Sequence, residues 1–210
     1  GNSTIQDVRV TGTVNRTTFD AGGLVGAAKD NTTIQDVTAS VDVTDDGGDS
    51  AVGGLVGGLE DDSIIQNVTV SGNVTGGGGV GGLVGQIRGN STIQNATASG
   101  NVTGVAGLSE RAVGGLVGAN RQGIIKNATA LGNVSGINTV GGLVGSNARS
   151  FDDNRAIIQD STASGDISGT ASVGGLVGEN NDDGVIKNTT ASGSVTGEES
   201  VGGLVGSNNG

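Results

Sequence analysis

The chain contains no cysteine, proline, histidine, tryptophan, tyrosine or methionine, and two phenylalanines in 210 residues. Aromatic side chains dominate most globular cores, so a core here has to be thin and built from valine, isoleucine, leucine and alanine. Without cysteine there are no disulfides. Without histidine or cysteine, most catalytic triads, thiol chemistry and typical zinc sites are excluded. We therefore expect a protein that is not an enzyme.

Positive charge is also scarce, since ten lysines and arginines face 21 acidic residues and the net charge is -11. This balance argues against a nucleic-acid partner, because phosphate binding requires clusters of lysine and arginine. Aspartate outnumbers glutamate 16 to 5. That profile resembles proteins adapted to high salt, and equally fits a soluble, self-repelling acidic surface.

Long apolar runs are absent too: no run reaches 18 residues, so we expect no transmembrane segment. No signal peptide is visible at Gly1. The chain begins and ends within a repeat, so we expect a single domain over residues 1–210 that is part of a longer array.

Glycine is abundant, with 44 residues, and much of it belongs to one recurring phrase. VGGLVG stands at 52–57, 113–118, 140–145, 173–178 and 201–206, lies within 79–85, and has the variant AGGLVG at 21–26. An isoleucine recurs in step with the phrase, and a valine or isoleucine follows it nine residues later in all seven repeats. The unit is about 28–33 residues long, with two joints that accept insertions and are therefore surface loops.

Each unit offers three short apolar segments rich in valine, isoleucine and threonine, which favour strands over helices. From Ala96 to Val102, small apolar and polar residues alternate with period two, so one set faces inward. Ile93 is out of phase with this alternation, which predicts a bend at Gln94-Asn95. Seven copies of three short strands predict an all-β fold, a parallel β-solenoid of about seven coils that stack about 4.8 Å apart. The predicted core consists of the repeated leucines and isoleucines: Leu24, Leu55, Leu83, Leu116, Leu143, Leu176, Leu204, Ile5, Ile34, Ile65, Ile93, Ile125, Ile158 and Ile186.

The repeats, read as VGGLVG followed by IQNATASGNVTG, resemble the GLUG repeat, which is named for glycine, leucine, a large apolar residue and glycine. The resemblance covers essentially the whole chain. It departs from the family where Val-Thr, Ala-Thr, Ser-Thr or Thr-Thr stands in place of a Ser-Tyr-like pair after the asparagine. GLUG repeats occur in large secreted and surface proteins. The resemblance therefore implies an extracellular stalk, adhesive array or filament at the cell surface, and it implies no activity.

The partners we expect are other copies of the chain, joined head-to-tail or laterally, or flanking repeats of the same chain, because open sheet edges invite pairing. Cell-surface or glycan ligands are also left open. If VGGLVG is one strand, both valines face outward as an apolar stripe for lateral packing. If Gly-Gly makes a turn, the first valine joins the core, and the breaking tendency of Gly-Gly favours the turn.

Three pairs of aspartates follow the glycine phrase, and oxygen ligands of this kind suit calcium. The candidate metal residues are Asp61, Asp62, Asp152, Asp153, Asp182 and Asp183. No other cofactor is expected. A solvated acidic loop also explains the pairs and is the favoured interpretation, so a module that holds calcium or a glycan is the alternative to a purely structural role.

The repeats also contain eleven Asn-x-Ser/Thr sequons, which are acceptors for N-glycosylation in a secreted protein. Asn73, Asn101 and Asn133 alternate with inward-facing residues and should point outward, so they are the candidate glycosylation sites. Another row lies at the predicted bend, where short acceptor side chains bond to the backbone and stack as a ladder. It comprises Asp7, Asp36, Asn67, Asn95, Asn127, Asp160 and Asn188, and we expect its asparagines to be occluded.

Overall fold

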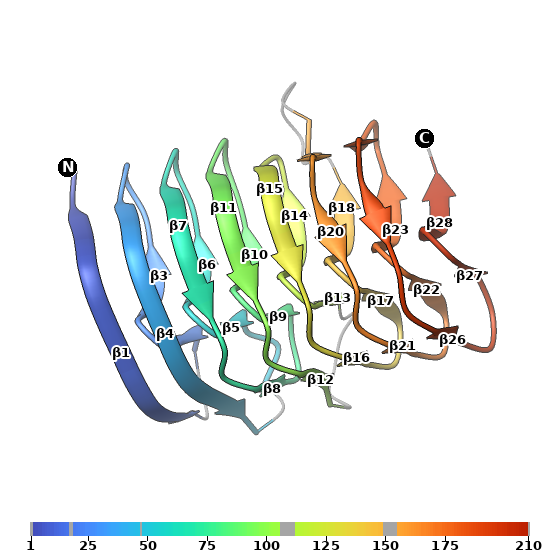
Figure 1. The fold of residues 1–210 in the computed structure, drawn as a ribbon, viewed down its shortest axis with the longest axis horizontal. Coiled ribbons are helices and arrows are strands. Elements are labelled where there is room, and N and C mark those ends of the chain that lie inside the picture. The colour runs from blue at the N-terminus through green and yellow to red at the C-terminus, as the bar shows by residue number, and fades with distance from the viewer. Residues whose placement is uncertain (1, 17–18, 47, 106–111, 149–154, 210) are drawn as a thin grey trace.

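The computed structural model describes residues 2–16, 19–46, 48–105, 112–148 and 155–209. These residues form a parallel β-solenoid of about seven coils, which run from the N-terminus to the C-terminus along the long axis (Figure 1). The predicted fold is therefore confirmed. In the described part of the chain no helix is long and apolar enough to cross a membrane.

The largest sheet has 14 strands and is bent, because its two halves belong to different segments of each coil. Its strands are β1 (Thr4–Arg16), β4 (Thr33–Asp45), β7 (Ile64–Val70), β8 (Val74–Gly76), β11 (Thr92–Ala98), β12 (Val102–Gly104), β15 (Ile124–Ala130), β16 (Val134–Ser135), β19 (Ile157–Gln159), β20 (Thr162–Ala163), β21 (Ile167–Ser168), β24 (Val185–Lys187), β25 (Thr190–Ala191) and β26 (Val195–Thr196). The single strands β1 and β4 run through both halves in the first two coils, whereas the next coils break between the halves, at residues 71–73 and 99–101, which is a different corner from the predicted bend at Gln94-Asn95.

Two seven-stranded sheets divide the glycine phrase between them. The first contains β2 (Ala21–Gly22), β5 (Val52–Gly53), β9 (Val80–Gly81), β13 (Ala112–Gly114), β17 (Thr139–Gly141), β22 (Ser172–Gly174) and β27 (Val201–Gly202). The second contains β3 (Val25–Ala28), β6 (Val56–Leu59), β10 (Val84–Ile87), β14 (Val117–Arg121), β18 (Val144–Ala148), β23 (Val177–Asn181) and β28 (Val205–Asn209).

The phrase turns at its second glycine and leucine, as the Gly-Gly prediction favoured. In the second coil Val52, Leu55 and Val56 are all 0% exposed, so neither valine forms an outward stripe. The first valine packs in one core cluster, while the leucine and the second valine pack in another. Glycine is required at the turn, because a Cβ on Gly54 would lie 2.2 Å from the carbonyl oxygen of Gly82 in the next coil.

The predicted core positions align coil upon coil, for example Ile65 with Ile93 and Ile93 with Ile125. Ten of the fourteen are fully buried, and these are Leu55, Leu83, Leu116, Leu143, Leu176, Ile34, Ile65, Ile93, Ile125 and Ile158. Ile5, Leu24 and Ile186 lie in end coils and are partly buried. Leu204 is 42% exposed, contrary to the expectation, because no described coil covers it.

Candidate functional site

Four of the six predicted metal-binding aspartates form two tight corners. Asp61 and Asp62 have φ of 54° and 59°, and Asp182 and Asp183 have φ of 49° and 61°. Two successive residues with positive φ are the pattern of a type I′ turn, which favours Asn, Asp and Gly. The pairs thus have a conformational reason to be aspartate, which the sequence reasoning did not consider.

The remaining two candidates, Asp152 and Asp153, lie outside the described residues. Asp61-Asp62 and Asp182-Asp183 belong to non-adjacent coils. Across the described part of the chain no group of three or more acidic side chains is arranged to hold a metal ion. Calcium binding by these pairs stays a prediction.

The bend ladder adopts the geometry predicted for Gln94-Asn95. Every member has φ between 50° and 55°, and the strand pairing skips it, so Gln94 and Ala96 are paired on either side of an unpaired Asn95. The amide Nδ2 of Asn95 donates to Oδ1 of Asn67 at 3.1 Å, and Asn67 donates likewise to Asp36 at 3.0 Å. The expectation that these side chains are occluded is wrong, since all of them are exposed.

A second ladder is formed by the candidate glycosylation residues, which point outward and are exposed. Oδ1 of Asn73 accepts the backbone N–H of Asn101 at 3.0 Å, and Oδ1 of Asn101 accepts that of Asn133 at 3.0 Å. The carbonyl oxygen of each amide is therefore used between coils. The nitrogen, which is the atom that carries a glycan, makes no bond between coils among the residues that the structure describes.

A third ladder lies inside the rod and was missed by the sequence reasoning. Asn120 and Asn147 are 0% exposed. Asn120 Nδ2 donates to Asn147 Oδ1 at 2.9 Å, and Asn147 Nδ2 donates to Asn180 Oδ1 at 2.8 Å. Asn120 also closes its own corner, because its Nδ2 donates to the Gly123 carbonyl at 3.0 Å and its Oδ1 accepts the Gly123 N–H at 2.9 Å.

The first three coils close the same corner differently. They carry Ala28, Leu59 and Ile87 in the column where later coils carry asparagine. Hydroxyl groups accept the backbone N–H groups of these corners instead. The Thr32 N–H donates to Ser63 Oγ, and the Ser63 N–H donates to Ser91 Oγ, both at 3.1 Å. The corners are thus structural in both halves of the rod.

Ionic contacts also link neighbouring coils. Glu60 accepts from Lys29 Nζ and from Arg88 Nη1, both at 2.9 Å. Burial acts to raise the pKa of Glu60, but the hydrogen bonds and charges of Lys29 and Arg88 outweigh it and lower the pKa. The hydrogen bond to Glu60, and then its charge, raises the pKa of Lys29. Arg16 Nη1 pairs at 2.8 Å with Asp45, whose side chain is fully buried.

These features define a repeat protein of the β-solenoid class, in which side chains mainly bond to their counterparts in adjacent coils. The chain belongs to the GLUG-motif family. The family model, described as the GLUG motif, matches residues 48–75, 76–103, 109–135, 136–168 and 169–196. Comparison with curated proteins gives no match, and neither does comparison with solved structures.

Proposed function

We propose that the chain is a non-catalytic, extracellular rod segment of a surface adhesin, stalk or filament, which extends by adding coils at its ends. The observation that carries the proposal is the apolar surface of the last coil. Val201 and Leu204 are 44% and 42% exposed, whereas their counterparts Val173 and Leu176 are 0% exposed under the next coil. Open strands with apolar side chains favour pairing with another strand.

The backbone supports the same direction of growth. A Cβ on Gly175 would lie 2.2 Å from the carbonyl oxygen of Gly203, which stacks on it, while a Cβ on Gly203 meets nothing within 4 Å. The partner is a further repeat, either of a flanking segment or of a second copy. The extracellular setting rests on the family resemblance and on an acidic, cysteine-free composition compatible with it.

Electron microscopy and sedimentation of the purified segment test the filament version. We expect rods that lengthen with concentration in the wild type, and short rods with Gly203→Ala, whose new methyl group blocks an incoming coil. Ser200→Ala, an exposed change in the same coil, should behave as the wild type. Dispersed wild-type monomers at all concentrations would reject self-assembly and leave the stalk. Resistance of the native protein to protease added to intact cells would argue against a surface location.

A further inference from the structure

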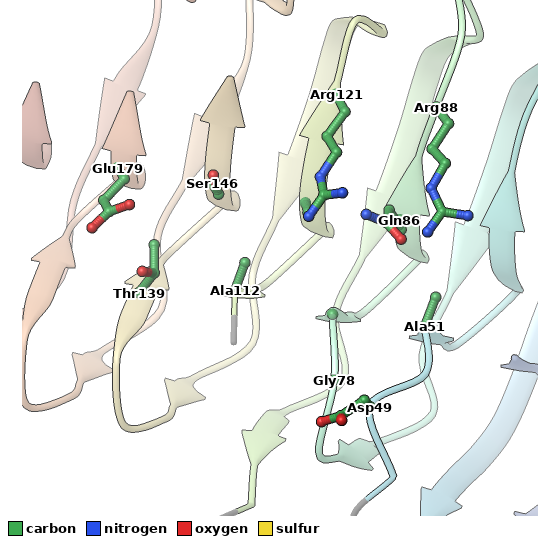
Figure 2. Close-up of a pocket in the computed structure, with 12 residues that line it drawn as sticks. Asp49, Ala51, Gly78, Gln86, Arg88, Ala112, Arg121, Thr139, Ser146 and Glu179 are labelled. Atoms are coloured by element: carbon green, nitrogen blue, oxygen red, sulfur yellow. The ribbon is translucent and has the colours of Figure 1, made fainter. Parts of the chain in front are cut away.

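An outer groove of about 230 Å³ runs across several coils where the glycine phrase turns (Figure 2). One wall is formed by residues just before or at the start of the first glycine-rich strand, including Ala112, which begins β13, and Thr139, which begins β17. The floor is a column of outward positions in the next strand: Gln86 in β10, Ala119 in β14 and Ser146 in β18 are in register. The small side chains of the alanines and the serine at these positions leave the space that forms the groove.

Two arginines from adjacent coils reach into this groove. Arg88 and Arg121 are labelled side by side in Figure 2, and each directly follows one of the paired residues Ile87 and Asn120. Adjacent coils lie about 4.8 Å apart, so the two like charges repel unless an anion lies between them. Glu60 pairs with Arg88 on the side away from Arg121. Within the described residues Arg121 has no ion-pair partner.

The rest of the groove is polar and carries acceptors. Ser146 and Thr139 line its middle, and Glu179 lies at one end. Glu179 is held in place, because its Oε1 accepts from Ser172 Oγ at 2.9 Å and its Oε2 accepts from Asn181 Nδ2 at 3.3 Å. Asp49 lies at the opposite end. A polyanion with a charge on every unit would meet the Glu179 carboxylate, which disfavours nucleic acid or polyphosphate.

We infer that the groove binds an extended acidic oligosaccharide, with a uronic-acid carboxylate on Arg88 and Arg121 and sugar hydroxyls on Ser146, Thr139 and Glu179. Guanidinium groups bind carboxylates through paired charge-assisted hydrogen bonds. Arg88 uses one nitrogen for Glu60, and a guanidinium has five N–H donors. Hydroxyl groups can donate to the Glu179 carboxylate, which a second anion could not do. This inference does not depend on whether the rod forms filaments.

Isothermal titration of the segment with a tetrasaccharide in which glucuronic acid alternates with neutral N-acetylglucosamine, at low ionic strength, tests the inference. We expect saturable binding, which methyl esterification of the sugar carboxylates abolishes. Arg121→Gln should weaken binding about tenfold, the loss typical of one charge-assisted contact. Ser146→Gln fills the groove without changing charge, copies Gln86 of the same column, and should also weaken binding.

Lys126→Gln is the matched control, because it removes one positive charge from the outer face of β15, where Gln94 occupies the equivalent position in the preceding coil. It should bind as the wild type does, and unchanged melting curves for all variants would show that they fold. Absence of saturable binding would overturn the inference, as would binding that Arg121→Gln leaves unchanged. An equal loss of affinity with Lys126→Gln would overturn the inference too, because it would show that general charge attraction, and not the groove, binds the sugar. Tighter arginine-dependent binding of polyphosphate would replace the sugar with a phosphate ligand.

Discussion

Replacing the buried Asn120 with leucine tests whether the internal asparagine ladder holds the second half of the rod together. The change leaves two groups without the partners that Asn120 provides: the buried N–H of Gly123, and Oδ1 of Asn147. The Gly123 carbonyl keeps the N–H of Ile157 at 2.9 Å. Each orphaned group costs about 1–3 kcal/mol. Burying the leucine returns about 1.5–3 kcal/mol, so we expect a net loss of about 1–3 kcal/mol.

A double-mutant cycle with Asn147→Leu separates the ladder from general packing. Asn147→Leu alone orphans one N–H of Asn120 and Oδ1 of Asn180. In the double variant the Asn120–Asn147 contact is absent on both sides, so two orphans remain where the single variants together have four. The double variant should therefore cost about 2–6 kcal/mol less than the sum of the single variants, because two orphaned groups are avoided.

Guanidinium denaturation with linear extrapolation measures these free energies. Repeat arrays can unfold in parts, so hydrogen exchange at the Gly123 amide should locate the loss at the corner. Additive single effects, within about 0.5 kcal/mol, would refute the ladder, and so would a stabilising Asn120→Leu.

Three further predictions concern stacking, pH and modification. Gly142→Ala places a Cβ 2.1 Å from the carbonyl oxygen of Gly175 in the next coil and should lower the melting temperature strongly. Gly203→Ala places a Cβ with nothing within 4 Å and should leave the melting temperature unchanged. Equal effects of the two changes would contradict the stacking argument. The pKa of Glu60 is lowered in the folded protein, so the ionised carboxylate stabilises the fold above the ordinary pKa of about 4.3, and this stabilisation is lost as the pH falls through the folded pKa. The difference in melting temperature between the wild type and Glu60→Gln should therefore shrink on acidification. A difference that stays constant with pH would contradict this prediction. In a host that attaches N-glycans, peptide mass spectrometry should find sugar on Asn101 but not on Asn95, whose Nδ2 is a ladder donor; the reverse pattern would show that the ladder does not protect Asn95.

The period of the chain was readable because the fold stacks identical positions. A leucine or isoleucine placed once per coil meets its own counterpart above and below, as Ile93 meets Ile65 and Ile125. Single-residue alternation then gives the inward and outward faces, and one break in phase locates the bend at Asn95. These features depend on local pattern alone, and the structure follows them.

The internal asparagines could also have been read from the sequence. Asparagine stands four residues after the phrase leucine in the last four repeats, as at Asn120 and Asn147, whereas Ala28, Leu59 and Ile87 stand there in the first three. The column therefore belongs to the core, and its polar members had to be partnered. Treating the residues after the phrase as surface loop hid this. The conformational role of the aspartate pairs was missed for a related reason, since they were interpreted as a ligand set or a solvated loop and not as residues suited to positive φ.

The two kinds of corner show that substitutions in this rod are coupled, within a coil where asparagine closes the corner and between adjacent coils where hydroxyl groups do. A Cβ on Gly123 would lie 2.6 Å from Asn120 Oδ1, and a Cβ on Gly184 would lie 2.4 Å from Asn180 Oδ1. An asparagine that closes its own corner thus requires glycine at the corner position. The exception is the repeat with an inserted segment in its sequence, which has Ala156 at this position. Where the column is aliphatic, the corner residue is Thr32, Ser63 or Ser91, and the buried N–H groups of Thr32 and Ser63 are each accepted by the hydroxyl of the corner residue in the next coil. In the asparagine half, exchange of one member without the other should therefore fail, so the pair of asparagine and glycine, and not the single residue, is the unit of substitution there.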